Sequence, residues 1–154
     1  MARCLILVGC QNDYFKFGGE LYFESAETYL PIIRQYIFDI AEQTDNSIIY
    51  LIDRHMPNSV LFKDKVVKPH CLGSPNWDLV TELVSFDFPL YARREYVEVD
   101  DNVVFSQDIK DLVIKSDEVI VIGCNTHFLT QLLDYLNSFN KKFETRIFPE
   151  EKCK

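Results

Sequence analysis

Polar and ionisable residues follow four apolar runs of this chain, at the point where each run ends. The stretches are Gly9-Cys10-Gln11-Asn12-Asp13, Asp53-Arg54-His55, Arg93-Arg94 and Gly123-Cys124-Asn125-Thr126-His127. If these runs are parallel strands, their carboxyl ends meet at one edge of a sheet, where such folds bind ligands. The remaining histidine, His70, lies in a long loop that can return to the same edge. We therefore expect the chemistry of the protein at this edge.

A metal site is the first chemistry that the spacing suggests. Asp53 and His55 are separated by one residue directly after an apolar run. Side chains two residues apart in an extended chain point the same way, so both can ligate one ion. With His70 they form an Asp/His/His set that suits zinc or iron. The alternative is that Asp53 caps the loop while both histidines lie on the surface, and the D-x-H pattern alone does not decide between them.

The elements that would position these residues alternate between strands and helices. Apolar runs predict strands at 3–8, 47–53, near 89–93 and at 118–123, and a more polar strand at 142–148. Helical spacing of apolar residues predicts helices at 25–44, about 77–84, 107–116 with Ser106 as N-cap, and 126–139. This alternation is typical of a parallel α/β sheet with helices on its faces. We predict a single three-layer α/β/α domain over residues 1–154.

Composition and charge argue against several function classes. The chain has 154 residues, of which 47% are hydrophobic and 26% charged, as is ordinary for a globular protein. Its net charge of -8 argues against direct nucleic-acid binding, which depends on Lys and Arg at the phosphates. No apolar stretch approaches the ~18 residues of a membrane span, and we expect no membrane association. The five cysteines form no CxxC pair, which indicates a reducing compartment, and we expect the cytoplasm.

Four ordered motifs resemble those of the isochorismatase-like cysteine hydrolases, most closely the nicotinamidases. The motifs are LILVGCQNDYF, DRHMPNSVLF, PHCLGS and VIGCNTHFL, and the resemblance extends from about residue 3 to 139. It implies an α/β/α fold with a mainly parallel five- to six-stranded sheet, here shortened at its C-terminal end. It also implies amide hydrolysis by a Cys/Asp/Lys triad beside a metal ion, without a nucleotide cofactor.

The family's catalytic residues have no intact counterparts in this chain. The resemblance places the general-base Asp at Gly9, the nucleophilic Cys at Leu129, and the Lys at Arg93 or, preferably, Arg94. Arginine keeps the charge of lysine but does not exchange a proton near neutral pH. Cys124 and His127 are weak substitutes, since Cys124 can equally be packed in the core and His127 can cap the following helix.

The metal ligands that the resemblance implies are better retained. They fall on Asp53, His55 and His70, while the family's third His falls on Ser59, where a water could complete a zinc site. We therefore expect one zinc or iron ion. The other expected pocket residues are Gln11, Asp13, Tyr14, Arg93 and Asn125.

These observations favour a catalytically inactive protein that acts as a binding or structural subunit of a protein assembly. The first alternative is a metal-dependent amidohydrolase that acts on nicotinamide-like amides, and the second is a sensor that binds a small molecule without turning it over. The 14% aromatic content and an exposed sheet edge favour a protein partner or a homo-oligomer. Gly9 and Leu129 predict an apolar, partly closed pocket.

Overall fold

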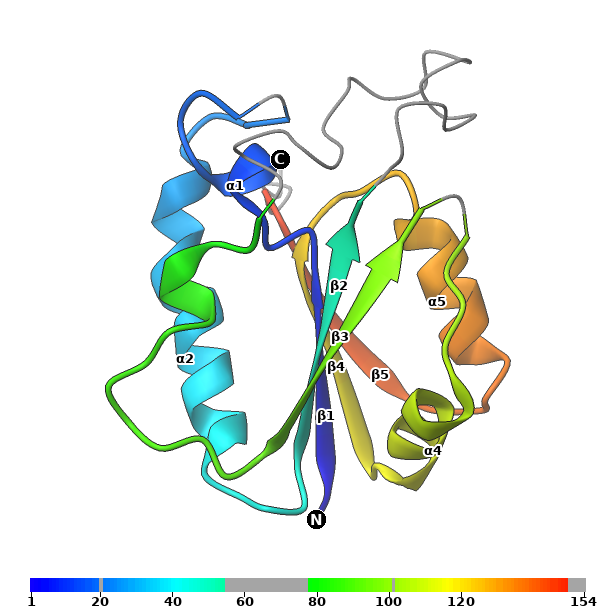
Figure 1. Cartoon of the computed structure of the whole chain (residues 1–154). Coiled ribbons are helices and arrows are strands. Elements are labelled where there is room, and N and C mark those ends of the chain that lie inside the picture. Colours follow the sequence, from blue (N-terminus) through cyan, green and yellow to red (C-terminus); the bar gives the residue numbers. More distant parts are fainter. Residues whose placement is uncertain (20, 55–77, 101, 150–154) are drawn as a thin grey trace, which may run out of the picture.

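Five parallel strands form the centre of the structure, a computed structural model that describes residues 1–19, 21–54, 78–100 and 102–149 (Figure 1). Their order across the sheet is β3-β2-β1-β4-β5. The strands are β1 (Arg3–Val8), β2 (Ser47–Asp53), β3 (Arg93–Val99), β4 (Glu118–Cys124) and β5 (Phe143–Phe148). All carboxyl ends therefore lie at one edge, as expected from the alternation of elements.

Helices cover both faces of the sheet and make the fold a three-layer sandwich. The 3-10 helix η1 (Ala26–Tyr29), α2 (Leu30–Ala41) and the 3-10 helix η2 (Thr81–Leu83) lie on one face, and α4 (Gln107–Lys115) and α5 (Leu129–Asn137) on the other (Figure 1). A single turn of helix, α1 (Asn12–Phe15), follows β1 at the carboxyl edge. Within the described residues, no helix has both the length and the apolar character needed to cross a bilayer.

Two hydrophobic clusters hold the layers together, one on each face of the sheet. Alternate residues of the central strands point to opposite faces. Leu5, Leu7 and Tyr50 therefore pack under α2, whereas Ile6, Val8 and other residues of β1 and β2 pack under α4 and α5. Burial on both faces explains why these two strands are continuous apolar runs.

The strands β1 and β2 have the predicted bounds, and Ser106 caps α4 by accepting a hydrogen bond from the Ile109 N–H. The predicted helix at 25–44 is instead η1 followed by the shorter α2, and only the 3-10 turn η2 forms in the described part of 77–84. The first difference concerns the ends of a helix, where local turns compete with the regular helix. In the second, a single 3-10 turn stands where a longer helix was predicted.

The predicted third strand near 89–93 is wrong, because β3 begins only at Arg93. The apolar residues Tyr91 and Ala92 precede the strand, and their N–H groups donate to the Ala41 carbonyl instead. The strand itself is at the sheet edge and half-exposed, so it mixes charged with apolar residues (RREYVEV) rather than forming an apolar run. Arg93 and Arg94 consequently lie at the amino edge of the sheet.

Candidate functional site

The ends of β1 and β2 are joined by the side chain of Gln11. Its Nε2 donates to the carbonyl oxygen of Asp53 at 2.8 Å, and its Oε1 accepts from the Asp53 N–H at 2.7 Å. Both residues are fully buried. The paired bonds fix the position of Asp53 relative to the loop after β1, so the carboxylate is held at the carboxyl edge of the sheet.

The Asp53 carboxylate is the centre of a buried polar cluster. Tyr14 Oη donates to Asp53 Oδ2 at 2.6 Å, and His127 Nδ1 lies 3.4 Å from the same oxygen. Burial, with the nearby Asp53 charge, raises the pKa of Tyr14 well above its ordinary value, so the phenol stays protonated as a donor. The three residues come from α1, β2 and the loop after β4, three segments that meet only in the folded chain.

The space beside Gly9 is filled by residues of the loop after β4. Gly9 has a φ of +64°, and a β-carbon placed on it would lie 2.5 Å from Cys124 Sγ and 2.8 Å from Thr126 Cγ2. Cys124 Sγ also donates to the Gly9 carbonyl oxygen at 3.4 Å. No side chain fits at position 9 without displacing these neighbours. Sequence reasoning placed Thr126 at this edge of the sheet but did not indicate its contact with Gly9, which depends on how the segments after β1 and β4 pack against each other.

Cys124 is a core residue, in agreement with the packed alternative. Burial is the main cause that raises the pKa of the Cys124 thiol well above its ordinary value, with further contributions from Cys10 and Asp53. The thiol is therefore neutral at physiological pH and a poor nucleophile. The expectation that His127 caps the following helix is wrong, since the N-cap of α5 is Phe128 and has no side-chain cap. His127 faces Asp53 instead.

The other predicted pocket residues at this edge differ in burial. Gln11, Asp13 and Tyr14 are buried there, whereas Asn125 is exposed. Leu129 begins α5 and packs against the hydrophobic cluster under α4 and α5.

The prediction that Arg93 and Arg94 belong to the site is wrong. Arg93 Nε donates to Glu95 Oε1 at 2.6 Å, and Arg94 Nη1 donates to the Val84 carbonyl oxygen at 3.1 Å. Both begin β3, at the opposite end of the strand from the site. The error follows directly from the misplaced third strand.

Comparison with known proteins gives matches in structure alone. No family model and no curated protein matches the sequence. The structure superimposes on an N-carbamoylsarcosine amidase from Thermoplasma acidophilum with a TM-score of 0.72 and 15% identity, over 94% of this chain and 81% of that chain. A pyrazinamidase/nicotinamidase from Streptococcus mutans gives a TM-score of 0.72 and 22% identity, over 93% and 83%. An isochorismatase-like hydrolase from Alkaliphilus metalliredigens gives 0.67 and 16%, over 94% and 79%.

The chain has the isochorismatase-like hydrolase fold. The fold expected from the four sequence motifs is thereby confirmed, with five strands in the described residues. At these levels of identity the comparison concerns the arrangement of the elements, while the chemistry of the site has to be argued from this chain's own residues.

A metal ion is bound in one solved structure with the isochorismatase-like fold, the pyrazinamidase of Pyrococcus horikoshii in complex with zinc, at a TM-score of 0.56 and 17% identity. Of the ligands expected here, Asp53 is described, whereas His55, Ser59 and His70 lie outside the described residues. Among residues that the structure describes, no three His, Cys, Asp or Glu side chains form a group able to hold a metal. The described part of the site is therefore not a metal centre by itself, and we assign no chemical step to a metal.

Proposed function

We propose that this protein does not hydrolyse amides by the Cys/Asp/Lys mechanism and acts as a binding or structural subunit of a protein assembly. The observation that supports this proposal most directly is the contact between Gly9 and Cys124. The β-carbon of an aspartate at position 9 would lie 2.5 Å from Cys124 Sγ, so the thiol would have to move to admit the carboxylate. Without it, the carboxyl end of β1 offers no general base where the family resemblance requires one.

The other two catalytic positions support the same proposal. Leu129 has no nucleophilic atom, and Arg94 lies at the far edge of the sheet, where it bonds to Val84. Cys124 cannot replace the missing nucleophile easily, because burial raises its pKa and keeps the thiol protonated. The positions that the family resemblance assigns to the base, the nucleophile and the lysine therefore supply none of these groups, which supports the proposal.

The first test is an assay of ammonia release by the full-length protein. Nicotinamide, pyrazinamide and N-carbamoylsarcosine are the substrates to use, because structural relatives bear those names. The Streptococcus mutans enzyme serves as the positive control. We expect no release above the buffer background; release by the wild type that Asp53→Asn and His127→Ala abolish would overturn the proposal.

The assembly itself is tested by native mass spectrometry of the protein isolated from its own cells. We expect recovery in a stoichiometric complex, and a free chain that carries a small molecule would contradict it. The mass of such a molecule would favour the sensor alternative. Cell fractionation tests the expected cytoplasmic location.

A second candidate function, amide hydrolysis by an activated water, is favoured by the pair formed by Asp53 and His127. A carboxylate 3.4 Å from an imidazole nitrogen can orient the ring and stabilise its protonated form, as a general base requires. Where the expected zinc or iron is bound by Asp53, His55 and His70, it would supply a water of lowered pKa. Metal analysis of the full chain and of Asp53→Asn decides this point: one ion per wild-type chain, lost in the variant, favours the metal-dependent hydrolase.

A further inference from the structure

The strand β3 presents half of its backbone hydrogen-bonding groups to solvent. It lies at the edge of the sheet formed by the described residues, where it pairs with β2 alone. The Arg93 N–H donates to the Asn46 carbonyl, and the Val99 carbonyl accepts from the Arg54 N–H, so odd-numbered residues of β3 face β2. The N–H and C=O groups of Arg94, Tyr96 and Glu98 therefore point outward. No described residue hydrogen-bonds these groups.

The side chains of these three residues carry charges in an order that matches the same strand running in the opposite direction. Arg94, Tyr96 and Glu98 alternate with their neighbours and share one face of β3. Tyr96 lies in the middle, stacked on Tyr50 with ring centroids 5.0 Å apart and half of its surface exposed. A positive and a negative side chain thus stand at equal distances along the strand on either side of an exposed ring.

We propose that two copies of this chain associate by antiparallel pairing of their β3 strands about a two-fold axis at Tyr96. In this register each outward-facing backbone group meets an outward-facing group of the second copy, which is the arrangement of hydrogen-bonded antiparallel pairs. Arg94 of each copy then lies opposite Glu98 of the other, and the two Tyr96 rings adjoin. The contact closes on itself, as an isologous dimer interface must. The product is one continuous ten-stranded sheet, twice the five strands of one chain.

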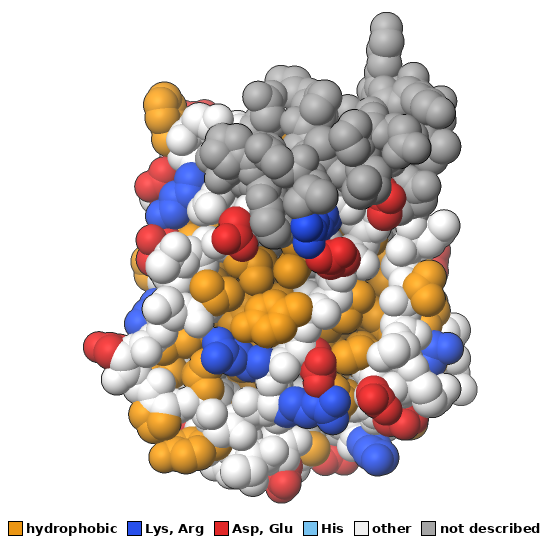
Figure 2. All heavy atoms as spheres, in the orientation of Figure 1, with side chains coloured by type: hydrophobic (Ala, Val, Ile, Leu, Met, Phe, Trp, Pro, Cys, Tyr) orange, Lys and Arg blue, Asp and Glu red, His pale blue; other side chains and the backbone are white. Residues whose placement is uncertain are grey.

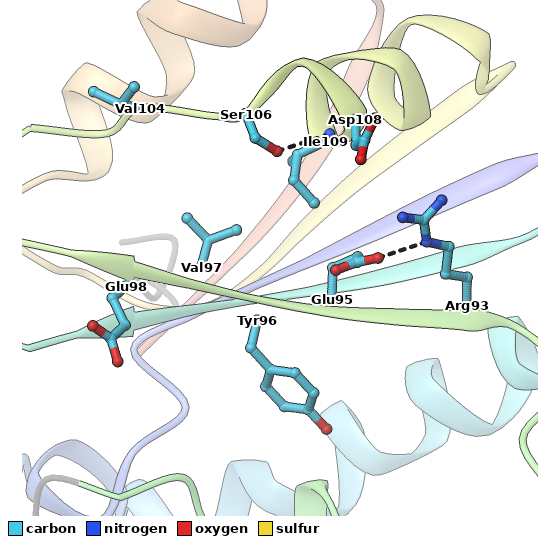
Figure 3. Close-up of a pocket in the computed structure, with 9 residues that line it drawn as sticks. All are labelled: Arg93, Glu95, Tyr96, Val97, Glu98, Val104, Ser106, Asp108 and Ile109. Atoms are coloured by element: carbon cyan, nitrogen blue, oxygen red, sulfur yellow. Dashed lines mark hydrogen bonds and ion pairs between the residues drawn. The ribbon is translucent and has the colours of Figure 1, made fainter.

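The described surface beside β3 is hollowed on the side of α4. A groove of about 430 Å³ runs between β3 and the start of α4, lined by Glu95, Val97, Val104, Asp108 and others (Figure 3). In the proposed register Val97 of the second copy lies opposite Glu95 and beside this groove. Figure 2 shows hydrophobic side chains in the middle of this face, with acidic and basic side chains around them.

The charges on β3 also argue against the alternative that they protect the edge from pairing. Charged side chains and prolines are among the features that keep edge strands from pairing, and charges of one sign on both copies repel each other. Here the two charges have opposite sign, and both are exposed. Glu98 is paired with Arg54 in its own chain, but its side chain remains 59% exposed and has a second oxygen to offer.

The other edge strand, β5, is a weaker candidate for the same contact. It carries Glu144 and Arg146, which could also face each other across a two-fold axis. However, the Arg146 guanidinium lies over the rings of Tyr36 and Phe148, at 5.8 and 5.5 Å from their centroids. Arg146 is half-buried, whereas Arg94 remains exposed although it bonds to the Val84 carbonyl. A reversal at Glu144 therefore makes a matched control.

Charge exchange tests the register directly. We expect sedimentation analysis of the full-length protein to give a dimer, and Arg94→Glu or Glu98→Arg to weaken it about 10- to 100-fold by turning two attractions into two repulsions. The double variant Arg94→Glu/Glu98→Arg restores the dimer. An equimolar mixture of the two single variants restores it as well, because a dimer with one copy of each variant again pairs an acidic with a basic side chain at both contacts. Glu144→Arg leaves the dimer intact.

Residue-resolved amide hydrogen exchange gives a second, independent readout. In the dimer the amides of Arg94, Tyr96 and Glu98 are protected, and they exchange faster in Arg94→Glu, while those of Glu95 and Val97 stay protected in both. Circular dichroism establishes that the variants are folded; if a reversal unfolds the chain, Arg94→Gln and Glu98→Gln replace it, with a smaller loss of affinity.

Three results would overturn the proposal: a monomeric wild type at the highest soluble concentration, a dimer insensitive to both β3 reversals, or a dimer lost in Glu144→Arg. A different protein bound at β3 in place of the second copy would overturn it as well. The dimer goes beyond the proposed function and does not depend on it, since association is measured without substrate and ammonia release is measured separately.

Discussion

Cys124 Sγ lies 2.5 Å from the point where a β-carbon on Gly9 would stand, although the two residues are 115 positions apart in the chain. The thiol thus occupies the space where the family resemblance expects the side chain of a catalytic Asp. Gly9 is required here for two reasons, its left-handed φ of +64° and this contact. The absence of a side chain at position 9 and the position of Cys124 thus belong to the same packing arrangement.

Substitution of Gly9 by Ala should destabilise the protein more than the same change at Gly18. Both glycines have a positive φ, but a β-carbon on Gly18 meets nothing within 4 Å. Gly18→Ala should cost about 1–2 kcal/mol of unfolding free energy for the left-handed backbone alone. Gly9→Ala should cost about 1–3 kcal/mol more, from overpacking against Cys124 and Thr126. Urea unfolding of both variants measures the difference.

Removal of the sulfur provides the control for this first prediction. The double variant Gly9→Ala/Cys124→Ala should lose less unfolding free energy than the two single variants lose together, because the closest clashing atom is gone. Two results would contradict this explanation: equal losses of unfolding free energy in Gly9→Ala and Gly18→Ala, or a loss in the double variant equal to the sum of the single losses. Either would mean that the contact with Cys124 is not what excludes a side chain at position 9.

The parts of the fold that follow from local pattern could be predicted, and those that depend on distant contacts could not. The strands β1 and β2 are buried on both faces, so their apolar runs mark their ends correctly. The strand β3 lies at the sheet edge and mixes charged with apolar residues, and the apolar stretch before it led to a predicted strand that ends at Arg93 instead of beginning there. The pairing of Gln11 with Asp53 and of His127 with Asp53 joins residues 42 or more positions apart, which no local spacing indicates.

Replacement of Tyr14 by Phe should destabilise the protein more than the same change at Tyr50. Both hydroxyls donate at 2.6 Å, but Tyr14 donates to the Asp53 carboxylate and Tyr50 to the Leu83 carbonyl. Loss of a bond to a charged acceptor costs about 1.5–3 kcal/mol of unfolding free energy, and loss of a bond to a neutral one about 1 kcal/mol. Thermal and urea unfolding of Tyr14→Phe and Tyr50→Phe measure the two losses. A larger loss of unfolding free energy in Tyr50→Phe would contradict a charged, buried Asp53.

Alkylation of cysteine thiols should distinguish a closed site from an open one. Burial raises the pKa of Cys10 and Cys124, and both side chains are inaccessible. We expect iodoacetamide at neutral pH to leave both unmodified in the folded protein and to modify all five cysteines in denaturant, as read by peptide mass spectrometry. Rapid modification of Cys124 in the folded protein would mean that the space beside Gly9 is accessible to a ligand.

Stability should fall at alkaline pH in a way that depends on Cys4. Burial raises the pKa of the Cys4 thiol from 9.0 to about 11. Between these values the unfolded chain loses the Cys4 proton while the folded chain keeps it, so the contribution is present below about pH 9 and is lost as the pH approaches 11. The expected slope from this group is at most about 1.4 kcal/mol per pH unit. We therefore measure the unfolding free energy of the wild type and of Cys4→Ala, each relative to its own value at neutral pH. The two curves should diverge in this window, because the variant loses less unfolding free energy than the wild type. Parallel curves would show that Cys4 titrates alike in both states and that the amino-terminal half of β1 is not the sealed core that the structure describes.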